Sequence, residues 1–124
     1  MKLGITLLSF LVLDSFYLGY MSEYYNKIIS DIQKSPMKLR KAPMVGAYII
    51  ILSSWYYFIY KNIKNQTTIK NIIDSAILGF FMYSLFDLTN HAIFEKWDIK
   101  TTIIDSLWGM TLYTIPTIIY STSI

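Results

Sequence analysis

Residues 42–60 read APMVGAYIIILSSWYYFIY, a run of 19 residues without a charged side chain. At a rise of about 1.5 Å per residue, a helix of about 20 apolar residues crosses the roughly 30 Å hydrocarbon layer of a bilayer. Residues 106–124 form a second uncharged run of 19 residues. Of the two remaining apolar stretches, Leu3–Ser22 carries one charge, on Asp14, and Ser75–Phe94 carries one, on Asp87. The sequence therefore predicts an all-α integral membrane protein with four transmembrane helices.

The chain of 124 residues has room for one domain, which we place over residues 1–124 as an up-down helix bundle. We expect its helices over residues 3–21, 43–60, 72–94 and 102–120. In residues 23–34, apolar side chains recur at helical spacing between charged ones, which predicts an amphipathic segment on the membrane surface. These apolar residues are Tyr25, Ile28, Ile29 and Ile32. The segment should end at Ser35-Pro36, because the residue before a proline avoids helical geometry.

The loops between the predicted helices differ in positive charge. Seven Lys or Arg residues lie after the first and third helices, and four lie on the opposite side. By the positive-inside rule the first set should be cytoplasmic, which places both termini outside. Four closely spaced residues of that set are expected to contact lipid headgroups: Lys34, Lys38, Arg40 and Lys41. The net charge of +3 suits anionic headgroups better than nucleic acid, so we expect the bilayer and no nucleic acid as a partner. A homo-oligomer is a further expected partner, because transport would need a path between subunits where the bundle has no charged residue.

Three aspartates, Asp14, Asp87 and Asp105, lie inside or at the edge of the apolar stretches, which contain no Lys or Arg to neutralise them. A charged side chain near the bilayer centre costs about 2.5–3.5 kcal/mol, so these aspartates are the first candidates for a functional role. In an up-down bundle all three lie toward the side with the more basic loops. We therefore predict one acidic pocket that opens toward one leaflet. The other half of the bundle is expected to be apolar and aromatic.

Helical spacing adds polar and aromatic neighbours to this predicted pocket. Asn90 and His91 follow Asp87 by three and four residues, so they share its helix face, and Tyr83 lies one turn earlier. Trp108 follows the aspartate of the fourth helix by three residues. We predict that this set binds a proton, a cation or a small polar solute. One histidine with scattered carboxylates predicts no metal site, and the absence of Cys excludes a Cys-based one.

The charge of the three carboxylates leaves several functions open. They should not all be ionised in a low dielectric, because desolvation and mutual repulsion disfavour the charged form. Bound protons or a bound cation would favour proton, cation or small-solute transport. Neutralisation by Lys96 or Lys100 from the adjacent loop would favour a structural or assembly protein. A lipid-modifying enzyme is a further alternative, but the chain has no phosphate loop or nucleophile elbow, and we predict no catalytic residue and no cofactor.

Two strings in the second half of the chain carry a family resemblance. Residues 83–90 read YSLFDLTN and residues 105–109 read DSLWG. Together they resemble the Tyr-Asp-Leu-Thr-Asn-like and Asp-x-x-Trp-Gly signatures of domain-of-unknown-function family 2177, a family of predicted membrane proteins. The string that begins at Asp14 is similar to a third signature of the family, with Tyr17 in place of the usual Trp. Trp97 resembles, in its position, the tryptophan that the family has between helices three and four. The resemblance implies no activity, but it implies four helices and a polar site built on Asp14, Asp87, Asn90 and Asp105.

Overall fold

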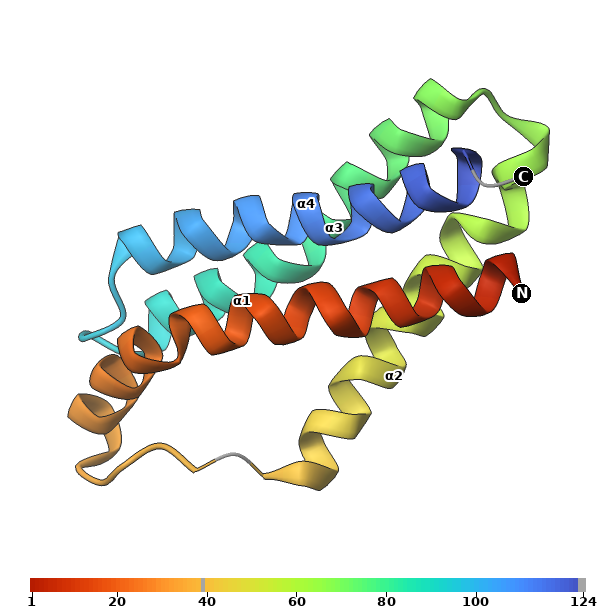
Figure 1. Cartoon of the computed structure of the whole chain (residues 1–124). Helices are drawn as coiled ribbons and strands as arrows, with labels where there is room; N and C mark the ends of the chain where they lie inside the picture. The colour runs from red at the N-terminus through yellow and green to blue at the C-terminus, as the bar shows by residue number, and fades with distance from the viewer. Residues whose placement is uncertain (39, 123–124) are drawn as a thin grey trace.

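The computed structural model describes residues 1–38 and 40–122, and this part of the chain is helical and contains no strand. Its elements are α1 (Lys2–Gln33), α2 (Lys41–Phe58), the 3₁₀ helix η1 (Tyr60–Asn65), α3 (Thr68–Ile93) and α4 (Ile99–Thr122). α4 packs along both α3 and α1, whereas α2 lies at an angle to the other helices (Figure 1). The predicted domain of residues 1–124 also includes Leu39, Ser123 and Ile124, which lie outside the described residues.

The first helix is longer than expected, because α1 continues without a break through the segment predicted to lie on the membrane surface. Its 32 residues measure about 48 Å, more than the roughly 30 Å hydrocarbon layer. Figure 1 shows the last turns bending away from the first part of the helix. Lys34 caps α1 in the left-handed conformation (φ 63°), and its N–H donates to the Ser30 carbonyl at 2.8 Å. The helix thus ends directly before Ser35-Pro36.

Among the described residues, three helical segments are long and apolar enough to cross a membrane: α1, α2 together with η1 (Lys41–Asn65), and α3. α4 is not among them, since it contains Asp105 and many hydroxyl side chains. It is also the helix with the most buried residues, because it packs against both α1 and α3. A helix that its neighbours shield from lipid can carry more polar side chains than one that faces lipid.

Two glycines hold α3 and α4 at close range. A Cβ atom added at Gly79 would collide with the backbone carbonyl of Gly109, and one added at Gly109 would collide with the carbonyl of Gly79. Small residues allow such close backbone approach between helices in membranes. The crossing fixes the position of Asp87 on α3 relative to Asp105 on α4.

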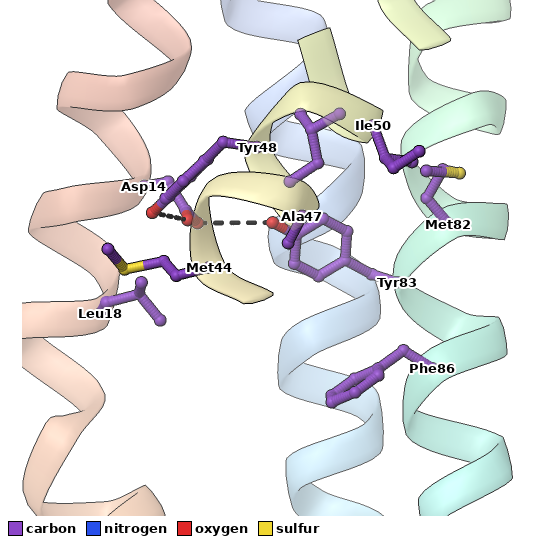
Figure 2. Close-up of a pocket in the computed structure, with 10 residues that line it drawn as sticks. Asp14, Leu18, Met44, Ala47, Tyr48, Ile50, Met82, Tyr83 and Phe86 are labelled. Atoms are coloured by element: carbon purple, nitrogen blue, oxygen red, sulfur yellow. Dashed lines mark hydrogen bonds between the residues drawn. The ribbon is translucent and has the colours of Figure 1, made fainter. Parts of the chain in front are cut away.

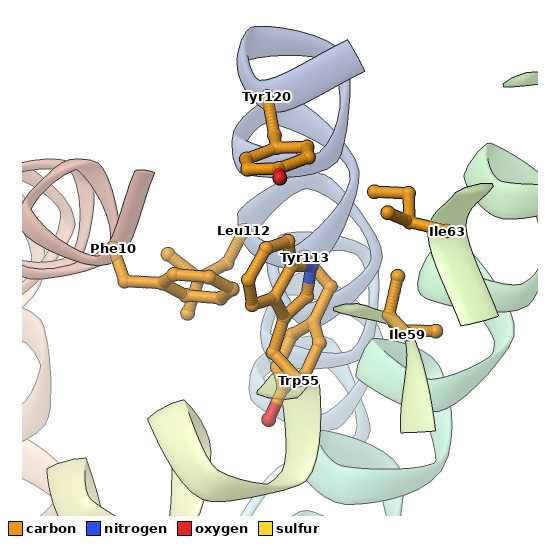
Figure 3. Close-up of a cluster of buried hydrophobic side chains, with 7 residues drawn as sticks. All are labelled: Phe10, Trp55, Ile59, Ile63, Leu112, Tyr113 and Tyr120. Atoms are coloured by element: carbon orange, nitrogen blue, oxygen red, sulfur yellow. The ribbon is translucent and has the colours of Figure 1, made fainter. Parts of the chain in front are cut away.

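A hydrophobic cluster closes the bundle at the end where α1 begins and α4 finishes (Figure 3). Phe10 packs edge-on against Trp55 and Tyr113, with ring centroids 5.8 and 5.3 Å apart. We call this region the core end, and its buried members are Phe10, Trp55, Ile59, Ile63, Leu112, Tyr113 and Tyr120. The predicted apolar and aromatic half of the bundle corresponds to this end.

The core end also contains a chain of uncharged hydrogen bonds. Trp55 Nε1 donates to Thr117 Oγ1 at 2.9 Å, and Thr117 Oγ1 lies 2.6 Å from Ser75 Oγ. Asn71 Nδ2 donates to the Ile63 carbonyl at 2.9 Å. These bonds connect α2 to α4, α4 to α3, and α3 to η1. The second half of α2 is therefore anchored to the bundle at this end.

Candidate functional site

Asp14 on α1 is buried and accepts hydrogen bonds from three other helices. The Tyr48 hydroxyl on α2 donates to Asp14 Oδ2 at 2.6 Å, and Trp108 Nε1 on α4 donates to Oδ1 at 3.0 Å. The Tyr83 hydroxyl on α3 donates to the same Oδ1 over a longer distance of 3.4 Å. Figure 2 shows the Tyr48 and Tyr83 side chains approaching Asp14 from two sides. All three donors are uncharged, so Asp14 joins the four helices without being neutralised.

Asp105 on α4 is buried against tyrosines of α1. The hydroxyls of Tyr17 and Tyr25 both donate to Asp105 Oδ1, and the two hydroxyl oxygens lie 3.1 Å from each other. The Tyr17 ring stacks on Trp108 with centroids 4.5 Å apart and planes 4° from parallel. Because Trp108 donates to Asp14, the stacked pair links the surroundings of Asp105 to those of Asp14.

Asp87 on α3 differs from the other two aspartates, because neither of its carboxylate oxygens has a hydrogen-bond partner among the described residues. The side chain is fully buried, at 0% exposure. Its polar neighbours are Asp105 and the buried indole N–H of Trp97, which interact with Asp87 electrostatically but form no hydrogen bond of normal geometry with it. A buried ionised carboxylate without a partner is very costly. Asp87 is therefore the group in this cluster that most needs a proton or a cation.

No cationic side chain of the described residues neutralises the three carboxylates. The ion pair found in this part of the chain joins Lys70 and Asp74 at 3.0 Å, one helical turn apart near the start of α3. Lys96 and Lys100 are exposed, and Lys96 Nζ donates to the Asp31 carbonyl at 3.4 Å. Neutralisation by a loop lysine, one of the options left open by the sequence, is thus not observed.

Two cavities adjoin the carboxylates. The acidic cavity, of about 550 Å³, is lined by residues that include Asp14, Asp105, Tyr25 and Trp97. The side cavity, of about 420 Å³, lies between α1, α2 and α3 (Figure 2). The two share one wall, formed by Asp14, Leu18, Tyr83 and Phe86. Apart from the carboxylates, most of the lining is apolar or aromatic.

Two of the predicted pocket residues lie away from the site, and Asp87, although it neighbours Asp105, also lines neither of the two cavities. His91 is exposed, and its Nδ1 lies 2.8 Å from the Trp97 carbonyl oxygen, which braces the loop between α3 and α4. Asn90 is half-buried and lines neither of the two cavities. The sequence predicted that Asn90 and His91 share a helix face with Asp87. Only part of that face packs against α4 near Asp105, and these two residues lie outside that part. Tyr83 lines both cavities, and Trp108 contacts Asp14.

Four residues at the site were not among the predicted pocket residues: Tyr17, Tyr25, Tyr48 and Trp97. Tyr25 was assigned to the amphipathic surface segment, but its hydroxyl donates to Asp105. Its spacing of eight residues from Tyr17 was the available signal, since such residues share a helix face. Tyr48 gave no signal, because the sequence does not define how α2 is rotated. Trp97 was noted for the family resemblance alone, yet it lines the acidic cavity.

The loops beside the acidic cavity carry charges with altered pKa values. Partial burial raises the pKa of Asp98, but hydrogen bonds from the Thr101 hydroxyl and N–H and from Tyr24 outweigh this effect and lower it overall. Asp98 thus caps the first turn of α4. The nearby Lys96 ammonium lowers the pKa of the exposed Lys34. The four predicted headgroup residues, Lys34, Lys38, Arg40 and Lys41, are all exposed.

A family model described as "Predicted membrane protein (DUF2177)" matches residues 1–121. The chain belongs to this family. The match confirms the resemblance carried by the strings around Asp87 and Asp105, and with the three apolar helical segments it places the protein in a lipid bilayer. The family description indicates no particular activity. No curated protein and no solved structure matches the chain significantly.

Proposed function

We propose that this membrane protein binds a proton or a small cation at Asp87, beside Asp105, and transports it across the membrane by way of the acidic cavity. The proposal includes α4 as a fourth membrane crossing in an up-down bundle. The observation that supports it best is the Asp87 carboxylate, which is fully buried and has no hydrogen-bond partner among the described residues.

The surroundings of Asp87 favour binding of positive charge over a purely structural role. Hydrogen bonds from neutral donors stabilise the other two carboxylates, so these have partners that do not depend on a ligand. Asp87 has instead a second carboxylate as its neighbour. Two adjacent carboxyl groups in a low dielectric retain a proton or attract a cation, because their repulsion and desolvation oppose full ionisation. Asp87 is thus the principal carrier in the proposal.

The position of the cavities restricts the path. The basic loops after α1 and α3 lie at the end of the bundle that contains Asp14, Asp87 and Asp105, which we call the acidic end. The core end is instead filled by aromatic side chains and uncharged hydrogen bonds. Exchange with the side of the basic loops is therefore the simplest route. A path to the opposite surface would run between subunits, which agrees with the predicted homo-oligomer.

A structural role for the aspartates is the second candidate, and the partners of Asp14 and Asp105 favour it for those two residues. Asp14 accepts bonds from α2, α3 and α4, and Asp105 accepts two from α1. Such bonds between membrane helices are worth about 0.6 kcal/mol on average. The two candidates differ at Asp87, which receives no such bond among the described residues.

Infrared difference spectroscopy on the protein in nanodiscs tests the proposal. The carbonyl stretch of a protonated carboxyl should be present at neutral pH and should fall when Na⁺ or alkali is added. It should be absent in Asp87→Asn. Asp74→Asn is the matched control, because Asp74 is paired with Lys70 away from the cavities and should leave the band unchanged. A band that is absent from the wild type, together with no response to added cations, would rule the proposal out.

A further inference from the structure

The walls of the two cavities indicate what kind of cation the site accepts, an inference that rests on the proposed cation binding at Asp87. We infer that the ligand is an amphiphilic organic cation. Its ammonium head would lie in the acidic cavity among the carboxylates, and its apolar chain would lie in the side cavity between α1, α2 and α3. The two cavities meet at a shared wall, so one molecule can occupy both.

Charge complementarity argues for a cationic head. Two carboxylates, Asp14 and Asp105, line the acidic cavity, and Asp87, which has no hydrogen-bond partner among the described residues, neighbours Asp105 without lining the cavity. None of these three forms an ion pair with a described Lys, Arg or His. Aromatic rings complete the wall, and the faces of Tyr and Trp attract ammonium groups, more strongly when the site is desolvated. The carboxylates would repel an anionic head, and a neutral head would not balance their charge.

The side cavity argues for an apolar chain. Apart from Asp14, Tyr48 and Tyr83, its lining is apolar: Leu18, Met44, Ala47, Ile50, Ile51, Met82 and Phe86. Two of these are methionines, whose flexible thioethers adapt to irregular ligands. Both cavities fall in the size range of small-molecule sites, about 300–1,000 Å³. Contact with such an apolar wall does not stabilise an inorganic cation, whereas it stabilises an alkyl chain.

The packing of α2 provides an entrance for the chain. The second half of α2 is held by the core end, but its first half is tied to the bundle by the Tyr48–Asp14 hydrogen bond. Ala47 and Ile50 line the side cavity and are also exposed. The side cavity therefore opens sideways between the helices, in the direction from which a molecule dissolved in the bilayer would come.

Binding of alkyltrimethylammonium ions to the protein in nanodiscs tests this inference. The probes are tetramethylammonium and octyltrimethylammonium, with octyl glucoside as the uncharged control of equal chain length. Calorimetry and tryptophan fluorescence report binding, since Trp97 lines the acidic cavity and Trp108 contacts Asp14. Ala47→Phe fills the side cavity. The matched control, Ile49→Phe, adds a ring to an exposed residue of the same helix outside the lining.

We expect Ala47→Phe to weaken octyltrimethylammonium binding by about tenfold or more, because several methylene groups lose their contacts. It should leave tetramethylammonium binding unchanged, and Ile49→Phe should match the wild type for both ions. Ile50→Phe is the second variant, for use if Ala47→Phe does not fold by circular dichroism. Asp87→Asn should weaken both ions.

Several outcomes would overturn the inference, and they separate it from the proposed function. Equal octyltrimethylammonium binding by Ala47→Phe and Ile49→Phe would exclude the side cavity as the chain site. Competition by octyl glucoside as strong as that by octyltrimethylammonium would show that an ordinary lipid chain occupies it. A change of oligomeric state in Ala47→Phe alone would show that a second copy covers it. In these cases retained tetramethylammonium binding would leave the proposed function standing, whereas no response of the wild type to any cation would contradict both.

Discussion

The two ends of this helix bundle accommodate buried polar groups in opposite ways. At the core end, Trp55, Thr117 and Ser75 form uncharged hydrogen bonds among themselves and are enclosed by aromatic rings. At the acidic end, three carboxylates converge beside two cavities, and Asp87 has no hydrogen-bond partner among the described residues.

This difference separates what holds the bundle together from what is available to bind a ligand. A network in which every member has a partner rigidifies the structure. A buried group without a partner costs stability, and sites of this kind are retained where function requires them. The core end therefore anchors α2, and the acidic end is the part of the bundle available to bind a ligand.

Substitution at the crossing between the two ends should have the largest effect. Gly79→Ala places a methyl group against the Gly109 carbonyl, so α3 and α4 must separate. We expect a loss of about 3 kcal/mol or more in the free energy of unfolding, typical of severe overpacking. Thermal unfolding in detergent, followed by circular dichroism, measures it. Gly46→Ala is the control, because a Cβ at Gly46 meets open space and should cost nothing.

The core end should be sensitive to the loss of one hydroxyl. Thr117→Val keeps the shape of the side chain but leaves the buried Trp55 N–H without its acceptor. We expect a cost of about 1–2 kcal/mol in the same unfolding measurement. Thr111→Val removes a hydroxyl that is exposed and bonds within its own helix, so its effect should stay within about 0.5 kcal/mol. Equal effects of the two variants would show that the core network does not anchor the helices.

The acidic end should respond differently at its two kinds of aspartate. Asp87→Asn removes a buried carboxylate without partners, so the free energy of unfolding should stay the same or rise by up to about 1 kcal/mol. Asp14→Asn disturbs a carboxylate with three donors and should cost about 1 kcal/mol. If Asp87→Asn were the more destabilising variant in chemical or thermal unfolding, Asp87 would have a structural role.

Asp98 should give the smallest effect, and one that depends on pH. Hydrogen bonds lower its pKa in the folded chain below the ordinary value of 3.8. Its ionised form therefore stabilises the fold at pH values above 3.8, and this contribution disappears as the pH falls through the lower folded value. The melting temperature of the wild type should exceed that of Asp98→Asn at pH 7, and the difference should shrink in acid. A constant difference across this range would contradict the assignment.

The sequence predicts the helices better than their mutual arrangement. A helix that crosses the hydrocarbon layer of a bilayer needs a long apolar run, so α1, α2 and α3 can be predicted from the distribution of apolar residues. The common depth of Asp14, Asp87 and Asp105 also follows from helix rise alone. By contrast, the bonds from Tyr48 and Tyr25 depend on helix rotation and on the bend of α1, which no local pattern encodes. The same limit explains why Asn90 and His91, on the face predicted for the pocket, line neither cavity.

Proton and cation flux in proteoliposomes tests whether Asp87 carries the transported ion. Vesicles that contain the wild type, Asp87→Asn or the control Asp74→Asn are compared after a pH or cation gradient is applied, with folding verified by circular dichroism. We expect flux in the wild type and in Asp74→Asn, and its loss in Asp87→Asn, because Asp87 is the proposed carrier. Equal flux in the wild type and Asp87→Asn, or no flux from any of the three, would contradict it.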